Sequence, residues 1–375
     1  MKKLTALFLV LCILLQLSAY AEFNAELNVQ SAILMEQQSG KILYEKNSHE
    51  SLPPASVTKI MTLLLIFEAI DRKELTYDTV ITASERAKSM GGSTIFLDTN
   101  EQMTLDDLIK GIAVASANDA CVAVAEHMCG SVEAFVAKMN ARAKELGMKD
   151  TNFINCSGLD DDNHYSSAYD IAVMSKELLK HEDVFKYTTI WMDSLREGKF
   201  QLANTNKLIR FYSGATGLKT GSTSKAGCCI SATAKRDGMN LIAVVMNAPD
   251  SKTRFSAASS LLNYGFSNYA VNNFSKKGSK VKEIPVIKGT KKSIFAITAE
   301  DSTVLIKKEH VNNIKTHLNL PKEIKAPIEK GEKIGEIILT LNGETLGKTA
   351  LIAHNTVLKK NTYRHFTEIM KSLFI

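Results

Sequence analysis

The stretch Pro54-Ala55-Ser56-Val57-Thr58-Lys59 opens an apolar run from Ile60 to Phe67. Prolines directly before such a run are typical of a helix start. Ser56 and Lys59, at positions i and i+3, then share one helix face. Because Lys59 is the only charged residue between Ser56 and Phe67, we expect it to be buried. Burial disfavours the ammonium form, and a neutral amine beside a hydroxyl can activate a serine nucleophile.

The same spacing recurs in Ser222-Thr-Ser-Lys225, at an expected turn. Ser-x-x-Lys is therefore weak evidence by itself, because short motifs also occur by chance. Taken alone, Ser56 is also consistent with a helix cap, with Lys59 extending its ammonium group to solvent. The rest of the sequence has to distinguish a capping serine from a nucleophile.

Two further polar groups interrupt apolar stretches. Ser116-Ala117-Asn118 lies inside the expected helical segment Gly111 to Ala120, where an unpartnered polar group costs about 1–3 kcal/mol. These side chains either pass a proton and hold a substrate amide, or cap the next helix. Gly217-Leu218-Lys219-Thr220-Gly221-Ser222 places a lysine and a threonine on a strand bounded by glycines. A ligand backbone can approach such an edge, although an ordinary hairpin strand has the same composition.

The order of expected elements indicates one sheet built from two distant parts of the chain. Two strands precede Ser56, helices dominate to about Lys180, and strands return at Gly217 before a closing helix. We therefore expect an α+β domain over residues 22–270, an antiparallel sheet flanked by helices with a helical subdomain. The expected strands are Ser31–Met35, Lys41–Glu45, Gly217–Ser222, Gly227–Ala234 and Asn240–Met246, and the closing helix is Thr253–Tyr264.

The composition changes after about Tyr269. Asn272-Asn273 and Ser275-Lys-Lys-Gly278 predict a linker. Short alternating segments then predict a small all-β domain over residues 271–360. In residues 361–375, apolar residues at steps of three and four predict an amphipathic helix with a basic polar face. Such a helix either lies on an anionic membrane surface or packs on the β domain.

The N-terminus predicts export. Lys2 and Lys3 precede an apolar run and then Ala19-Tyr20-Ala21, as in a signal peptide that ends at residue 21. The run is shorter than the roughly 20 apolar residues that span a bilayer. An uncleaved anchor is the alternative.

Charge and cysteine content limit the kinds of binding partner, disulfide and metal site that we expect. Residues 271–375 carry 19 Lys and Arg against 10 Asp and Glu, in a chain of net charge +6. This basic region fits an anionic surface, or a solvated lysine-rich β domain. An odd number of irregularly spaced cysteines follows residue 21, so we expect small buried hydrophobic residues and neither a disulfide framework nor a metal site. They are Cys121, Cys129, Cys156, Cys228 and Cys229.

Together the three motifs are far more specific than any one of them. A helical Ser-x-x-Lys, then Ser-x-Asn, then Lys-Thr-Gly on a strand is the set found in penicillin-binding proteins and class A β-lactamases. The chain resembles the low-molecular-mass penicillin-binding proteins that act as D-alanyl-D-alanine carboxypeptidases. The resemblance covers nearly all of the chain after residue 21. It is carried by Ser51–Met61, Ala115–Cys121, His164–Ala168, Thr216–Gly227 and Pro327–Gly331.

The resemblance implies a role for each motif residue. Ser56 would attack the penultimate D-alanine carbonyl of a peptidoglycan stem peptide ending in D-Ala-D-Ala, and Lys59 would accept its proton. Ser116 would relay a proton to the leaving amine, and Asn118 would orient the substrate amide. β-Lactam antibiotics would acylate the same serine. Neither a cofactor nor a nucleic-acid partner is expected.

The third motif is implied to hold the end of the substrate. Lys219 and Thr220, helped by Arg254, would bind the terminal carboxylate, which distinguishes this substrate from an internal peptide bond. The backbone N–H groups of Ser56 and Ser222 would form the oxyanion hole, with Gly221 on the same substrate-binding strand. The resemblance also favours a terminal membrane anchor, on the outer face of the cytoplasmic membrane.

Three alternatives stay open. A class A-like β-lactamase deacylates with a Glu in Glu-x-x-Asn, and no such motif occurs between Asn118 and Lys219. A D,D-endopeptidase or transpeptidase shares the acylation chemistry and differs in its products. A cell-wall-binding protein with a decayed site would lack core motif residues, all of which are present here.

Overall fold

The computed structural model describes residues 26–360. The expected signal peptide, residues 1–21, and the expected amphipathic helix, residues 361–375, lie outside these residues. The chain forms two compact units. The first ends at Gly265 and excludes the turn Arg236–Met239, which belongs with the second unit that begins at Phe266.

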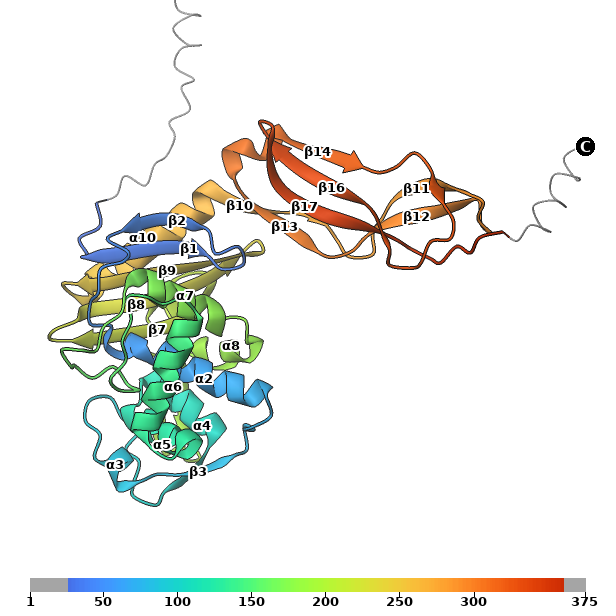
Figure 1. The fold of residues 1–375 in the computed structure, drawn as a ribbon. Helices are drawn as coiled ribbons and strands as arrows, with labels where there is room; N and C mark the ends of the chain where they lie inside the picture. The colour runs from blue at the N-terminus through green and yellow to red at the C-terminus, as the bar shows by residue number, and fades with distance from the viewer. Residues whose placement is uncertain (1–25, 361–375) are drawn as a thin grey trace, which may run out of the picture. The chain divides into compact units, whose positions relative to one another are not determined.

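The first unit is organised around a five-stranded sheet with the order β2-β1-β9-β8-β7 (Figure 1). β1 pairs antiparallel with β9, and Ile33 lies opposite Val244. The prediction of one sheet made from two distant chain segments is therefore confirmed. The strands are β1 Ser31–Glu36, β2 Ile42–Lys46, β7 Ala215–Thr223, β8 Gly227–Arg236 and β9 Met239–Ala248.

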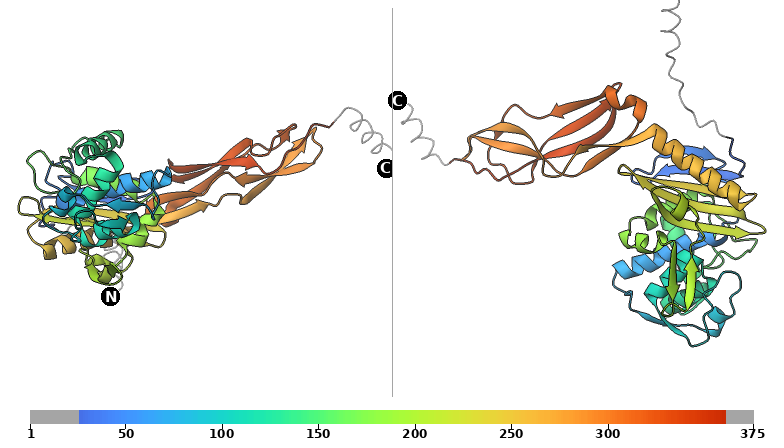
Figure 2. Two further views of the ribbon diagram at one scale, coloured as in Figure 1. Left: turned by 90° about the horizontal axis from the view of Figure 1, so that it is seen from below. Right: turned by 180° about the vertical axis from the view of Figure 1, so that it is seen from behind.

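Both faces of this sheet are buried, which explains the nearly continuous apolar sequence of β1 and β9. Ile33 and Met35 face the core that the sheet shares with the helical block. On the other face lies α10, Ser251–Asn268, which is longer than predicted (Figure 2). A Cβ at Gly265 would lie 3.1 Å from a methyl carbon of Leu34, so helix and sheet pack closely.

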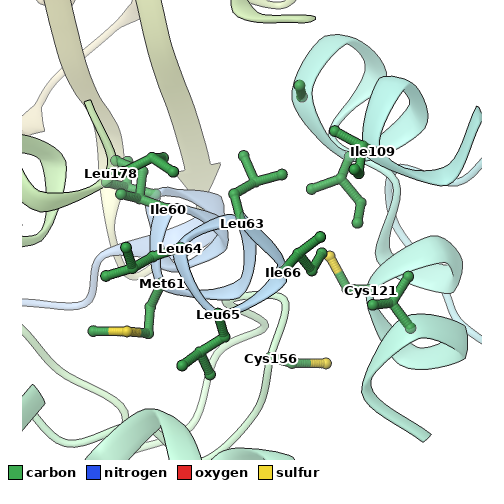
Figure 3. Packing of buried hydrophobic residues seen from close by; sticks show 14 of the residues in the cluster. Ile60, Met61, Leu63, Leu64, Leu65, Ile66, Ile109, Cys121, Cys156 and Leu178 are labelled. Atoms are coloured by element: carbon green, nitrogen blue, oxygen red, sulfur yellow. The ribbon is translucent and has the colours of Figure 1, made fainter. Parts of the chain in front are cut away.

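The helical block surrounds α2, Lys59–Asp71. Ten of its thirteen residues are buried, because this helix is apolar on all sides and lies in the core of the unit. Figure 3 shows its side chains between Leu178 of α7 and Ile109 of α4. A helix packed on every side holds its first residue, Lys59, in a fixed place.

Short elements and capped helices complete the first unit. Ser131 and Ser167 accept backbone N–H groups at the starts of α6 and α7, as polar N-caps do. Within residues 26–360, no single helix is long and apolar enough to span a membrane; α5 and α6 reach those criteria only as a pair bent by 85°. The remaining elements are η1 Ala55–Thr58, β3 Val80–Thr82, α3 Glu85–Lys88, β4 Gln102–Thr104, α4 Leu105–Lys110, η2 Gly111–Ala115, α5 Asn118–Cys129, α6 Val132–Glu145, α7 Ala168–Leu178, η3 Glu182–Val184, α8 Phe185–Thr188, β5 Met192–Leu195, β6 Phe200–Ala203 and α9 Leu208–Phe211.

The second unit is all-β apart from one short 3₁₀ turn, as predicted. Its six-stranded sheet has the order β14-β16-β17-β12-β11-β15, and β10 pairs with β13. The linker predicted at Asn272-Asn273 is wrong, because both residues pair with β13 inside β10. Backbone pairing outweighs the turn preference of asparagine here. The elements are β10 Tyr269–Ser275, β11 Lys280–Ile287, β12 Ser293–Thr298, β13 Ser302–Lys307, η4 Lys308–Asn313, β14 Ile314–Asn319, β15 Ile324–Lys325, β16 Lys333–Leu341 and β17 Glu344–Ala353.

The cysteines differ in burial. All five after residue 26 are free thiols. Cys121, Cys156 and Cys229 are buried, as predicted. The prediction is wrong for Cys129 and Cys228, which are partly exposed, because one lies at a helix end and the other near a strand end.

Candidate active site

Ser56 and Lys59 meet at the start of α2. Ser56 lies in the 3₁₀ turn η1, and Lys59 is the first residue of the α-helix that follows. Lys59 Nζ lies 2.8 Å from Ser56 Oγ. Ala55, just before the serine, has a φ of +48°, an uncommon conformation for a residue with a Cβ. Such strained residues concentrate at functional sites.

Lys59 is fully buried, as its place in an apolar run predicted. Besides the serine hydroxyl, its amine donates to Asn118 Oδ1 at 2.7 Å and to the Ser157 carbonyl at 2.6 Å. Burial is the main influence on this group and lowers the pKa of Lys59. A neutral Lys59 has a lone pair that can take the Ser56 proton along the 2.8 Å contact.

Ser116 and Asn118 do not cap the next helix. Ser116 follows the π-helix η2 and has a left-handed backbone with φ 64°, and the N-cap of α5 is Ala117, which makes no side-chain cap. Both polar atoms of the Asn118 amide are hydrogen-bonded within the protein: Nδ2 donates to the Gly91 carbonyl at 2.7 Å, and Oδ1 accepts from Lys59 Nζ. The capping alternative is therefore wrong, and Asn118 holds the lysine in place.

The third motif runs along β7 beside the serine. Lys219 is 1% exposed, and its Nζ donates to the Thr220 carbonyl at 2.9 Å. Burial, with a smaller contribution from the charge of Lys59, holds the pKa of Lys219 well below its usual range. Thr220 Oγ1 donates to the hydroxyl of Thr205 at 2.7 Å. A Cβ at Gly221 would lie 2.7 Å from the Ser56 backbone nitrogen, so only glycine permits this approach.

Ser222 lies near the C-terminal end of the same strand, and Arg254 reaches the strand from α10. Ser222 is exposed, and its hydroxyl lies 3.8 Å from Cys228 Sγ. The competing lysine of the Ser222–Lys225 motif pairs with Asp162.

The Arg254 guanidinium braces the backbone of β7 and β8. Arg254 Nη1 donates to the Gly221 carbonyl at 3.0 Å and to the Cys229 carbonyl at 3.3 Å. Its Nε is buried and has no hydrogen-bond partner among the described residues.

Sequence reasoning missed the loop that closes over Lys59. Asn155 Oδ1 accepts three backbone N–H groups, those of Ser157, Gly158 and Leu159, and so fixes the turn that presents the Ser157 carbonyl. Gly158 has a φ of +86°, and a Cβ there would lie 1.8 Å from the Ala55 carbonyl oxygen. The Asn-x-Ser-Gly pattern was the available signal, since asparagine and glycine favour such turns.

Among the described residues, 26–360, no cluster of three or more His, Cys, Asp or Glu side chains could hold a metal ion.

Comparison with known proteins places this site in a family. Residues 18–250 match the D-alanyl-D-alanine carboxypeptidase family (peptidase family S11), and residues 269–359 match the C-terminal domain of penicillin-binding protein 5. The chain is 46% identical over 334 residues to D-alanyl-D-alanine carboxypeptidase DacF of Bacillus subtilis, covering 88% of this chain and 86% of that protein.

Solved structures agree with the sequence relatives. Penicillin-binding protein 5 of Haemophilus influenzae superposes with a TM-score of 0.75 at 33% identity, covering 89% of this chain and 99% of that one. The ampicillin-bound penicillin-binding protein D2 of Listeria monocytogenes gives a TM-score of 0.60 at 32% identity, covering 65% of this chain and 99% of that one. This chain therefore belongs to the serine D-alanyl-D-alanine carboxypeptidases, among the low-molecular-mass penicillin-binding proteins.

Proposed function

We propose that Ser56 is the nucleophile and Lys59 its general base in the removal of the terminal D-alanine from peptidoglycan stem peptides. The 2.8 Å contact between the Ser56 hydroxyl and a fully buried lysine carries this assignment. Burial lowers the pKa of Lys59, which makes its neutral, proton-accepting form more accessible. As the Ser56 oxygen bonds to the penultimate D-alanine carbonyl carbon, its proton passes to Lys59.

The other motif residues complete the cycle. The backbone N–H groups of Ser56 and Ser222 stabilise the oxyanion as it develops. Ser116 returns the proton to the departing D-alanine amine, and water then cleaves the Ser56 ester. Asn118 orients the acyl amide, for which Nδ2 exchanges its bond to the Gly91 carbonyl.

The carboxylate of the leaving D-alanine lies against Lys219 and Thr220. The Lys219 amine and the Thr220 hydroxyl can both donate hydrogen bonds to a carboxylate. The close approach of Gly221 to the Ser56 backbone nitrogen places this part of β7 next to the nucleophile. Arg254 supports this strand through the Gly221 carbonyl. Direct contact between Arg254 and the carboxylate, which the family resemblance implies, is the alternative to this supporting role.

Penicillin labelling tests the nucleophile. We expect one covalent adduct by intact mass, mapped by peptide sequencing to Ser56; an adduct on Ser222 overturns the assignment. Lasting occupancy separates this enzyme from a class A-like β-lactamase, which hydrolyses the drug and regains its free serine.

Product analysis tests the reaction. A stem peptide that ends in D-Ala-D-Ala should release D-alanine, and amidation of its terminal carboxylate should sharply reduce turnover. Equal turnover of the amidated peptide favours the endopeptidase or transpeptidase alternative.

We infer that residues 1–21 are a signal peptide that directs export. The catalytic domain then spans residues 22–270 and the β domain residues 271–360. The family matches at residues 18–250 and 269–359 support this division. The basic, amphipathic sequence of residues 361–375 supports a peripheral place on the outer face of the cytoplasmic membrane.

Vesicle binding tests the membrane assignment. Full-length enzyme should sediment with anionic vesicles and release with salt, because exposed charge attraction is screened. Deleting residues 361–375 should leave an active enzyme in the supernatant. Equal sedimentation of both forms, or unfolding of the shorter one, overturns the anchor.

A further inference from the structure

His164 is a buried titratable residue with no part in the chemistry above. It is 3% exposed, and its ring lies near Phe153 with centroids 5.8 Å apart. Its Nε2 lies 2.8 Å from Thr58 Oγ1, and its Nδ1 lies 3.0 Å from the Ile154 backbone nitrogen. The imidazole thus connects two chain segments that are more than 90 residues apart.

The contacts fix the tautomer of this ring. A backbone N–H can only donate, so Nδ1 accepts from Ile154 and carries no proton. The ring proton of the neutral imidazole then lies on Nε2 and is donated to Thr58 Oγ1. Burial lowers the pKa of His164 to about 4, so this neutral form persists at neutral pH.

Both connected segments position Lys59 or one of its hydrogen-bond partners. Thr58 directly precedes Lys59 in the turn that also holds Ser56. Ile154 begins the loop whose Ser157 carbonyl accepts from Lys59 Nζ at 2.6 Å. A displacement of either segment would change the direction in which the lysine amine points.

We propose that His164 is a positioning residue, whose hydrogen bonds hold the Ser56–Lys59 turn and the Ser157 carbonyl at the separation that aims Lys59 Nζ at Ser56 Oγ. The inference rests on the proposed roles of Ser56 and Lys59. His164 touches neither β7 nor its carboxylate-binding residues in any of its described hydrogen bonds. Its loss should therefore slow acylation and leave the initial binding of substrate or drug nearly intact.

Two replacements separate the hydrogen bonds from the bulk of the ring. His164→Gln keeps an acceptor for the Ile154 N–H and a donor for Thr58, whereas His164→Leu keeps only an apolar side chain. Rapid-mixing kinetics with fluorescent penicillin give the dissociation constant of the first complex and the maximal acylation rate constant. The final adduct stoichiometry gives the folded fraction, so a partly unfolded sample does not lower the measured rate constant.

We expect His164→Leu to lower the maximal rate constant by roughly 10²-fold, as misplacement by about 1 Å does. The dissociation constant should stay near that of the unmodified protein, and His164→Gln should recover most of the rate. Thr58→Val removes the same bridge, so the double variant should be no slower than His164→Leu alone. His49→Leu is the matched control, because His49 is 62% exposed and bonds only to Asp150 among the described hydrogen bonds.

A normal rate in His164→Leu overturns the proposal, as does a change confined to the dissociation constant. Equal slowing in the Gln and Leu variants also overturns it, because ring shape and not hydrogen bonding would then matter. If instead the proposed roles of Ser56 and Lys59 are wrong, the unmodified protein itself will carry no adduct on Ser56.

Discussion

A Cβ atom at position 158 would lie 1.8 Å from the carbonyl oxygen of Ala55, the residue that precedes the nucleophile. Gly158→Ala should therefore displace either the Lys59 loop or the serine turn. We expect a lower melting temperature and penicillin acylation slowed by roughly 10²-fold. Gly198→Ala is the control, because Gly198 has the same φ of +86° with nothing within 4 Å. Equal behaviour of the two variants would show that backbone strain alone matters.

Removing the base should nearly abolish acylation. Lys59→Ala should slow penicillin acylation by about 10²–10⁴-fold, the usual contribution of general acid–base catalysis. Lys225→Ala should leave the rate unchanged, because this half-exposed lysine pairs with Asp162 at the surface. An unchanged rate in Lys59→Ala would remove the lysine from the mechanism.

The pH dependence of acylation should report the buried base. Only neutral Lys59 accepts a proton, so the rate should rise with pH through the pKa of Lys59. Because burial lowers this pKa, the half-maximal rate should fall below pH 10.5, the ordinary lysine value. A rate that rises only around pH 10.5 would contradict an assignment to this residue.

We expect the buried Lys219 to lower the stability of the folded protein, although its activity requires this lysine. Its folded pKa is well below 10.5, so at neutral pH the unfolded chain binds a proton that the folded chain resists. Lys219→Met should raise the melting temperature by at least about 2 °C at pH 7 while acylation falls. The gain should shrink as the pH approaches 10.5, where the unfolded lysine also loses its proton. Thermal melts at several pH values, with the exposed Lys235→Met as control, measure this; a constant gain would argue against a charge effect.

We expect the loss of Arg254 to impair turnover equally for substrates with and without a free terminal carboxylate. Glutamine cannot span the Gly221 and Cys229 carbonyls that the guanidinium contacts at 3.0 and 3.3 Å. Arg254→Gln should lower kcat/KM for a D-Ala-D-Ala peptide and for its amidated form by the same factor. A selective loss with the free acid would instead show that Arg254 binds the carboxylate directly.

The parts of the fold that follow periodicity were predictable. Short, nearly continuous apolar segments predicted β1 and β9, and the longer apolar run after Ser56 predicted both α2 and the burial of Lys59. β10 was missed because its Asn272-Asn273 pair favours turns in isolation, and only pairing with β13 makes it a strand.

The finer geometry of the site could not be predicted from the sequence, because it depends on the positions of backbone groups. The Ser157 carbonyl becomes a partner of Lys59 only through the turn that Asn155 fixes. Likewise, the left-handed backbone of Ser116 arises where a π-helix ends, which residue types alone did not indicate.

The amine of Lys59 meets partners that lie 59 and 98 residues away in the chain. We expect contacts of such long range to form late in folding, because closing long loops costs entropy before the contacts can form. The nucleophile is therefore activated only in molecules that have completed their fold. Covalent labelling by penicillin should consequently measure the fraction of native molecules. During refolding, this fraction should rise later than the helical circular-dichroism signal.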